Sequence, residues 1–292
     1  MCDEDSMDDM IEYNVRSRGL SRRQFGGMTL GATLMAALPA VASAVETKES
    51  EVEIKTPDGS ADAYFVHPVT GKHAGVLVWP DIFGLRPAFR QMGKRLAESG
   101  YSVLVVNPFY RVKKAPTSPE HPDFNDPPTR QALMGLMNSL TPTTTATDAK
   151  AFIGYLDSQG ATDGKRKIGT TGYCMGGPLV FETAAAVADR VGAGATFHGG
   201  GLVTDKPDSP HLLIPRMKAQ LLIAIAENDD QKQPEAKNVL RDSFAKANLP
   251  AEIEVYKGAL HGWCPPDSQV YNQEQAEKAW TRLLHLFKGA LA

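Results

Sequence analysis

Cysteine is scarce in this chain, and so are long hydrophobic runs and any excess of charge of one sign. Three cysteines in 292 residues cannot supply a disulfide scaffold, and none belongs to the C-x-x-C pair that marks a zinc site or a redox motif. The formal net charge of −3 gives no electrostatic reason to expect a nucleic acid or an anionic membrane as partner. The histidines lack metal-ligand spacing, so no metal site is expected.

What is present suits one globular domain preceded by an export signal. Hydrophobic residues make up 42% and charged residues 22% of the chain, which allows a sizeable core. Near the N-terminus, the sequence S-R-R-Q-F (21–25) precedes a modest apolar run (28–41) and the small-x-small sequence A-S-A (42–44). Together these describe a twin-arginine signal, residues 1–44, and predict a periplasmic or secreted protein.

The apolar run 28–41 is rich in glycine and alanine, and it is too short and too weakly apolar to favour a membrane span. An uncleaved membrane anchor is the alternative. Cleavage after Ala44 would leave a single domain, 45–292, that is close to neutral, because the removed segment holds four arginines and six acidic residues.

Strands and helices alternate along residues 45–292. Two short alternating runs joined through Pro57-Asp58-Gly59 predict an antiparallel hairpin at a sheet edge. The predicted strands are 51–55, 62–67, 74–79, 102–107, a short strand from 168, 193–198, 219–226 and 251–256. The predicted helices are 87–99, 129–140, 145–158, one opening at Gly176 or Gly177, 234–247 and 273–291. This alternation predicts the α/β class, with a mostly parallel sheet that is flanked by helices on both faces.

In such sheets, functional residues lie beyond the carboxyl ends of the strands. The proline- and charge-rich segment 108–128 follows one of these ends and is too long for a simple connector, so a pocket-lining loop or lid is expected.

The stretch I-G-T-T-G-Y-C-M-G-G-P-L-V (168–180) carries the strongest functional signal. It has the pattern of the G-x-S-x-G nucleophile elbow, with Cys174 in place of serine. Gly172 and Gly176 remove side chains that would crowd a nucleophile on a strained turn. The N–H groups and positive dipole end of the following helix favour a thiolate and an oxyanion. The alternative is a glycine-rich turn that holds an inert, buried cysteine.

A nucleophilic cysteine needs a base, and the base needs an orienting carboxylate. Carboxylates at Glu227, Asp229 and Asp230 follow the strand 219–226, and His261 follows the strand 251–256. These groups come in the order nucleophile, acid, histidine that hydrolases of this architecture use. His198, at the end of another strand, is the other candidate base, but the chain order favours His261.

Five motifs resemble the dienelactone hydrolase family of the α/β-hydrolase superfamily, and the resemblance covers nearly all of residues 45–292. They are T-G-Y-C-M-G-G (171–177), A-E-N-D-D (226–230), H-G-W (261–263), and the pair P-D-I-F-G-L-R-P (80–87) and V-N-P-F-Y-R (106–111). The resemblance implies that Cys174 is the nucleophile, Asp229 the acid and His261 the base. Ala226 stands where the family usually has glycine.

The resemblance also assigns supporting residues. Asp81 stands where the family has a glutamate bonded to the nucleophilic thiol, and its shorter side chain leaves thiol activation open. The oxyanion hole would be formed by the backbone N–H groups of Ile82 and Met175. Arg111 resembles the family arginine that binds a substrate carboxylate; the alternative is an ordinary surface arginine. Further candidates for substrate binding are Phe83, Tyr110, His198 and Trp263.

These residues predict a cysteine-dependent hydrolase of small esters or lactones, of the carboxymethylenebutenolidase type, which forms an acyl-enzyme without a cofactor. The alternative is a non-catalytic ligand-binding or redox-sensing thiol protein on the same fold. Cys264 keeps that alternative open, because a disulfide with Cys174 would silence the nucleophile. The physiological substrate and the oligomeric state are not determined by these patterns.

Overall fold

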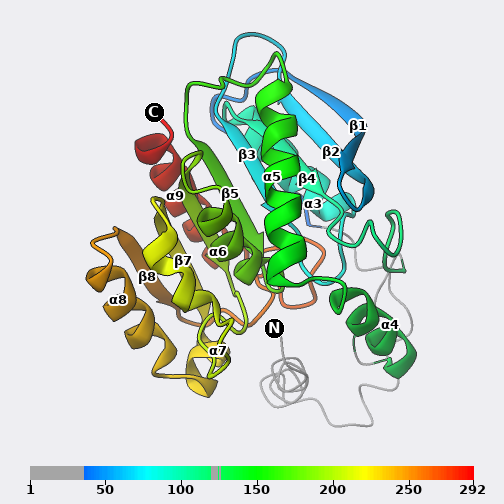
Figure 1. Ribbon diagram of the computed structural model, residues 1–292. Coiled ribbons are helices and arrows are strands. Elements are labelled where there is room, and N and C mark those ends of the chain that lie inside the picture. The colour runs from blue at the N-terminus through cyan, green and yellow to red at the C-terminus, as the bar shows by residue number, and fades with distance from the viewer. Residues whose placement is uncertain (1–35, 120–123, 125) are drawn as a thin grey trace.

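The computed structural model describes residues 36–119, 124 and 126–292 (Figure 1). The paired arginines and most of the apolar run of the predicted export signal lie outside these residues. Ala36 donates a backbone hydrogen bond to Pro266, and Leu38 packs against the buried core, whereas the A-S-A sequence (42–44) is exposed. No helix within the described residues is long and apolar enough to cross a membrane.

One eight-stranded sheet organises the chain, in the order β1-β2-β4-β3-β5-β6-β7-β8. The strands are β1 (Thr47–Thr56), β2 (Gly59–Pro68), β3 (Gly75–Trp79), β4 (Ser102–Val106), β5 (Ile168–Tyr173), β6 (Val191–Phe197), β7 (Gln220–Ala226) and β8 (Ala251–Tyr256). β1 and β2 form an antiparallel edge hairpin, and β2 pairs antiparallel with β4. All other neighbours are parallel. The expected hairpin and the mostly parallel sheet are confirmed.

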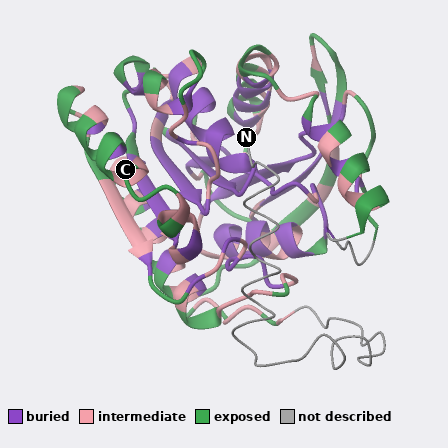
Figure 2. Cartoon of the chain, turned by 90° about the horizontal axis from the view of Figure 1, so that it is seen from below, coloured by how far each residue is buried: buried purple, intermediate pink, exposed green. Residues whose placement is uncertain are grey.

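Helices cover both faces of the sheet. They are α3 (Pro87–Glu98), α4 (Pro127–Met137), α5 (Pro142–Ser158), α6 (Gly176–Ala186), the 3-10 helix η1 (Pro210–Arg216), α7 (Glu227–Lys232), α8 (Ala236–Lys246) and α9 (Gln273–Ala290). α3 and α9 pack in one hydrophobic cluster, and α5, α6 and α8 pack in the cluster on the other face. Buried residues fill the sheet and the inner helix faces (Figure 2).

Local sequence explains most of these boundaries. α5 begins where Thr141 and Thr144 form a reciprocal capping box, with proline at the first helical position. The five residues of β3 and of β4 are all buried, as strands covered on both faces require. The predictions omitted η1 and α7. The polar helix α7, E-N-D-D-Q-K, has no hydrophobic periodicity, and the seven-residue 3-10 helix η1 contains two prolines and is too short to show a helical period.

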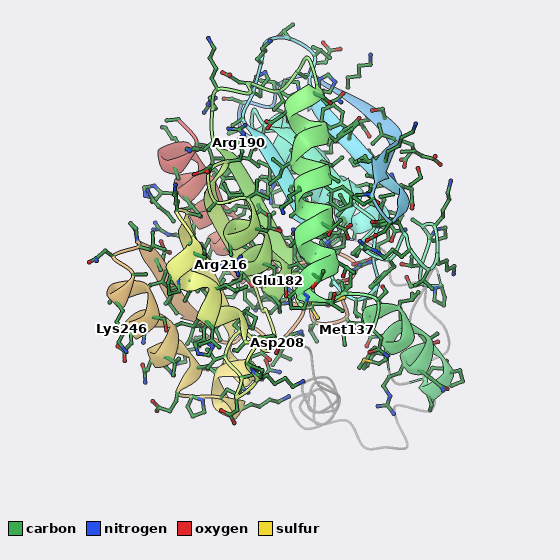
Figure 3. The ribbon with its side chains drawn as sticks, viewed as in Figure 1. Met137, Glu182, Arg190, Asp208, Arg216 and Lys246 are labelled. Atoms are coloured by element: carbon green, nitrogen blue, oxygen red, sulfur yellow. The ribbon has the colours of Figure 1, made fainter. Side chains whose placement is uncertain are left out.

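Glu182 is a buried carboxyl group within α6 (Figure 3). Burial raises its pKa from 4.5 to about 7. Between these two pH values the folded protein retains a proton that the unfolded chain releases. The contribution of Glu182 to the free energy of unfolding is therefore fully present below about pH 4.5 and is lost as the pH rises from there through about 7.

Glu182→Gln should flatten this part of the pH profile, because glutamine does not titrate. Urea unfolding of both proteins at about pH 5 and about pH 8 measures the difference. An identical loss of stability in wild type and Glu182→Gln would contradict the assignment.

Candidate active site

Cys174 stands on a strained turn between β5 and α6. Its φ angle is 52°, in the left-handed region that residues other than glycine seldom adopt. Two hydrogen bonds hold the turn: the Cys174 N–H donates to the carbonyl of Phe197 on β6, and the Gly177 N–H donates to the carbonyl of Cys174. Tertiary contacts thus maintain a conformation that the chain would not choose locally, as the glycine-bracketed motif predicts.

Two glycines allow the backbone to close tightly around this turn. A Cβ atom on Gly172 would lie 2.0 Å from the carbonyl oxygen of Gly176. A Cβ atom on Gly176 would lie 2.5 Å from the carbonyl oxygen of Trp79 and 2.8 Å from that of Pro80. The turn is therefore packed directly against the backbone that leads into Asp81 and Ile82.

Gly172→Ala is expected to destabilise the fold by about 3 kcal/mol or more, because the new methyl group would meet backbone that cannot move away. Gly154→Ala is the matched control, since a Cβ atom on that glycine of α5 has nothing within 4 Å. It should stabilise the protein by about 0.5–1 kcal/mol. Chemical denaturation of both variants measures the effects, and equal midpoints would contradict this account.

Asp229 and His261 meet beyond the carboxyl ends of β7 and β8. His261 Nδ1 lies 2.8 Å from Asp229 Oδ2, within hydrogen-bonding distance. The His261 backbone N–H donates to Asn228 Oδ1 at 2.9 Å, which joins the histidine loop to α7. Asp230 instead pairs with Lys237 at 2.6 Å. The geometry therefore distinguishes the two adjacent aspartates, and it makes Asp229 the one that orients the imidazole.

His198 lies against the His261 ring, with ring centroids 5.1 Å apart. It also contacts Trp263, at 5.0 Å, and has a φ of 43°. Burial lowers the pKa of His198 well below its ordinary value, and His261 lowers it further. His198 is therefore a neutral, enclosed ring that packs against the candidate base.

Asp81 belongs to a buried charge cluster that the sequence patterns did not reveal. Arg86 Nη1 and Nη2 donate to the two oxygens of Asp81 at 2.6 and 2.9 Å. The same guanidinium donates to both oxygens of Asp267, at 2.6 and 3.0 Å. Burial raises the pKa of the Asp81 carboxyl, and Arg86 opposes that rise. Arg86 thus links the loop that holds Ile82 to the loop that holds His261.

The loop around Ile82 is also fixed from within. The Phe83 N–H donates to Asp81 Oδ1 at 3.0 Å, and the Gly84 N–H donates to the Asp81 carbonyl. Gly84 has a φ of 76°, which closes this tight turn. The turn and the elbow are packed together through Gly176, so the backbones at Ile82 and Met175 lie on two adjoining segments of the sheet edge.

Apolar side chains cover Cys174, which is 3% exposed. The cluster that contains it draws on the elbow, on the Asp81 loop, on the segment after β4 and on α4; its members are Ile82, Phe109, Phe124, Leu133, Leu136, Met137, Cys174 and Met175. Phe83 and Met134 pack against it. α4 and α7 lie at the same end of the molecule (Figure 1). Phe109 and Phe124 of the segment 108–128 thus pack in the cluster that contains Cys174.

Arg111 and Tyr110 form ion pairs and hydrogen bonds with residues of the edge hairpin and of α5. Arg111 forms ion pairs with Asp148 at 2.7 Å and with Asp58 at 2.5 Å. The Tyr110 hydroxyl donates to Asp148 at 2.7 Å and lies 2.8 Å from the Thr56 hydroxyl. Both residues thus tie the edge hairpin to α5.

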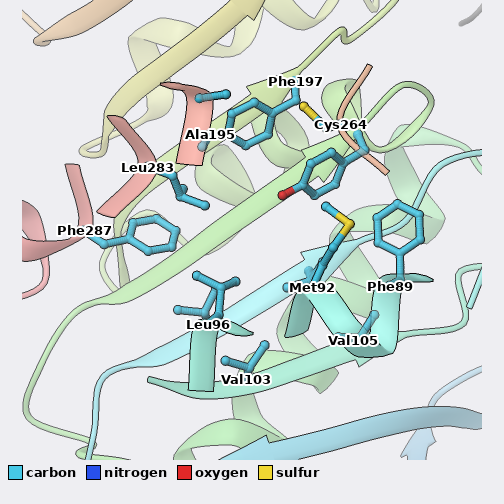
Figure 4. Packing of buried hydrophobic residues seen from close by; sticks show 14 of the residues in the cluster. Phe89, Met92, Leu96, Val103, Val105, Ala195, Phe197, Cys264, Leu283 and Phe287 are labelled. Atoms are coloured by element: carbon cyan, nitrogen blue, oxygen red, sulfur yellow. The ribbon is translucent and has the colours of Figure 1, made fainter. Parts of the chain in front are cut away.

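Trp263 is fully buried and stacks on Tyr256, with ring centroids 5.3 Å apart. Cys264 lies in the same core beside Phe197 (Figure 4). No disulfide joins Cys174 and Cys264. Burial raises the pKa of Cys264 well above its ordinary value, which makes this thiol unreactive. Within the described residues, no cluster of three or more His, Cys, Asp or Glu side chains could hold a metal ion.

Comparison with known proteins gives consistent matches. Residues 61–291 match the model of the dienelactone hydrolase family. The chain is 26% identical over 264 residues to a protein of Escherichia coli (strain K12) named "Putative carboxymethylenebutenolidase", with 87% of this chain and 93% of that protein covered. It is 26% identical to a Bradyrhizobium protein named "Probable 2-oxo-3-(5-oxofuran-2-ylidene)propanoate lactonase", with 80% of this chain and 91% of that protein covered.

Solved structures share the fold. A dienelactone hydrolase from Klebsiella pneumoniae, described as putative, superposes with a TM-score of 0.71 at 23% identity and covers 83% of this chain and 99% of its own. The dienelactone hydrolase-like promiscuous phosphotriesterase P91, from metagenomic libraries, has a TM-score of 0.68 at 21% identity and covers 84% and 99%. The architecture is that of an α/β-hydrolase.

Proposed function

We propose that this chain, which belongs to the dienelactone hydrolase family, hydrolyses small esters or lactones through Cys174, His261 and Asp229. The family establishes a hydrolase that acts on lactones or esters. The proposal that Cys174, His261 and Asp229 act as a catalytic triad rests on their geometry. A cysteine on a strained strand–helix turn and an Asp229–His261 pair at 2.8 Å both lie beyond the carboxyl ends of the sheet, in the chain order of a catalytic triad.

In the proposed mechanism, His261 removes the Cys174 proton, or stabilises a thiolate already formed, while Asp229 fixes the imidazole tautomer. The sulfur forms a bond to the carbonyl carbon, and the oxyanion is held by the N–H groups of Ile82 and Met175. When this tetrahedral intermediate collapses, the carbon–oxygen bond of the ester breaks, and the leaving oxygen takes the proton from His261. Water, deprotonated by His261, then cleaves the thioester and restores the thiol.

A panel of aryl esters, lactones and thioesters tests this proposal on the purified domain 45–292. Turnover is expected, and iodoacetamide should abolish it in proportion to labelling of Cys174 identified by mass spectrometry. Cys264 supplies an internal control, because its buried thiol should remain unlabelled. Hydrolysis that persists after complete alkylation of Cys174 would contradict the proposed nucleophile.

A non-catalytic thiol protein is the alternative, and it is less well supported. The family match covers residues 61–291, and no disulfide joins Cys174 to Cys264. A Cys174 that reacts with iodoacetamide in a protein that hydrolyses none of the panel would favour this alternative.

We also propose that residues 1–44 direct the protein to the twin-arginine export pathway. The exposed A-S-A sequence (42–44) just before β1 is accessible to a signal peptidase. Replacement of Arg22 and Arg23 by lysine should retain the protein in the cytoplasm with an uncleaved N-terminus, as fractionation and N-terminal sequencing would show. Efficient export of this double variant would overturn the assignment.

A further inference from the structure

We propose that Asn228 is a positioning residue for the proposed base, because its side chain fixes the backbone of His261 while Asp229 fixes the imidazole ring. This inference rests on the proposed hydrolase function and adds a residue to the same site. Asn228 stands one residue before Asp229 in α7, and the sequence patterns did not single it out. It contacts the main chain of His261, so its effect on the reaction passes through the base.

His261 is held at two points by two adjacent residues of α7. Asn228 Oδ1 accepts a hydrogen bond from the His261 backbone N–H at 2.9 Å, and Asp229 Oδ2 lies 2.8 Å from Nδ1 of the imidazole. The Asp229 contact alone would let the ring move together with its backbone. With the main chain also fixed, the ring keeps both its place and its orientation, on which proton transfer depends steeply.

The chain on either side of His261 has little rigidity of its own. Gly258 and Gly262 both adopt left-handed φ angles, of 75° and 96°, and glycine is the residue with the most conformational freedom. Glu227, the first residue of α7, also bonds to this loop. Its N–H donates to the Ala259 carbonyl at 2.9 Å, and its Oε2 accepts from the Gly258 N–H at 3.1 Å. The start of α7 is therefore the support against which the histidine loop is ordered.

The burial of Asn228 points to a role other than stabilising the fold. The residue is 6% exposed, and its Nδ2 has no hydrogen-bond partner within the described part of the chain. A buried amide donor without a partner costs stability, and an apolar side chain of similar size would avoid that cost. The hydrogen bond that its oxygen accepts comes from the main chain of His261. The asparagine is thus suited to hold the base.

Asn228→Leu tests this role, because leucine is similar in size but has no oxygen to accept the His261 N–H. With p-nitrophenyl acetate as substrate, we expect kcat to fall about tenfold to a hundredfold, and KM to stay within about threefold, because a misplaced base slows the chemical steps. The thermal midpoint should stay within about 4 °C of wild type, because the substitution also removes a buried donor without a partner. A wild-type kcat in Asn228→Leu, or a loss no greater than its unfolded fraction, would overturn the inference and leave the proposed hydrolase intact.

Asn228→Asp is the conservative variant, because it keeps an oxygen that can accept the same hydrogen bond. Its kcat should lie closer to wild type than that of Asn228→Leu, and an equal loss in the two variants would overturn the inference. Asn238→Leu is the matched control, since this asparagine is exposed on α8 and bonds to Glu235. Its kcat should stay within about twofold of wild type, as for most surface substitutions.

A double-mutant cycle shows whether Asn228 acts through the triad. Asp229→Asn already leaves the imidazole without its orienting carboxylate. In that background, Asn228→Leu should lower kcat by less than about threefold further, because residues that act as a unit are not additive. The same factor in both backgrounds would overturn the inference. A wild-type protein that hydrolyses no ester would overturn both the proposed function and the role of Asn228.

Discussion

Cys174→Ala is expected to lower kcat/KM for ester hydrolysis by about a thousandfold or more, because no other group in the turn can form the acyl-enzyme. The fold should tolerate the change, since alanine fits the space of a buried thiol. Steady-state kinetics on p-nitrophenyl acetate measure the loss, and thermal unfolding verifies that the variant is folded. Cys174→Ala with wild-type activity would remove this residue from the mechanism.

Cys264→Ala is the matched control for this variant. Its thiol is buried and packs in the core beside Phe197, away from the cluster that covers Cys174. Its loss should reduce stability through a small cavity, while kcat/KM should remain within about threefold of wild type. Equal inactivation by the two substitutions would indicate that both act through folding.

Asp229→Asn should have the second large effect, a fall in kcat of about a thousandfold to ten-thousandfold. An asparagine keeps the size of the side chain but no longer fixes the His261 tautomer or stabilises the imidazolium formed during acylation. His261 is 2% exposed, so water would do little to replace the stabilisation that the Asp229 carboxylate gives to the imidazolium. Pre-steady-state kinetics should show slow acylation with little change in substrate affinity.

Asp230→Asn separates this role from a general effect of negative charge on α7. Asp230 is the neighbouring residue and pairs with Lys237 near the protein surface. Its substitution should change kcat by less than about threefold, as for a surface ion pair. If Asp230→Asn were the more damaging change, the assignment of the acid would pass to Asp230.

The local pattern of the sequence was enough to predict the architecture. The strands β3, β4 and β7 are continuous apolar runs or nearly so, and helices such as α3 and α9 have amphipathic spacing, so burial and periodicity are visible within these segments. The pattern of the nucleophile elbow could also be recognised from the sequence, because Gly172, Cys174 and Gly176 are close together in the chain. The tight turn leaves no room for a side chain at either glycine. The order Cys174, Asp229, His261 followed from where these residues stand relative to strand ends.

The ion-pair partners of charged residues that are distant in the sequence could not be predicted from local patterns. Asp81 was expected to act on the thiol, yet both its oxygens are engaged by Arg86, which also reaches Asp267, 181 residues further along the chain. The sequence likewise did not show that Asp148 of α5 and Asp58 of the edge hairpin form ion pairs with Arg111, a candidate for substrate binding.

The sequence by itself determined the α/β class, the strained cysteine turn and the choice of candidate triad residues, because each depends on periodicity or on backbone geometry within a few residues. Only the tertiary structure decided which charged groups pair with each other and which side chains cover Cys174. These outcomes depend on side chains from distant segments that approach each other after the sheet has formed. The free energy of burying a charge then depends on the partner that the fold provides.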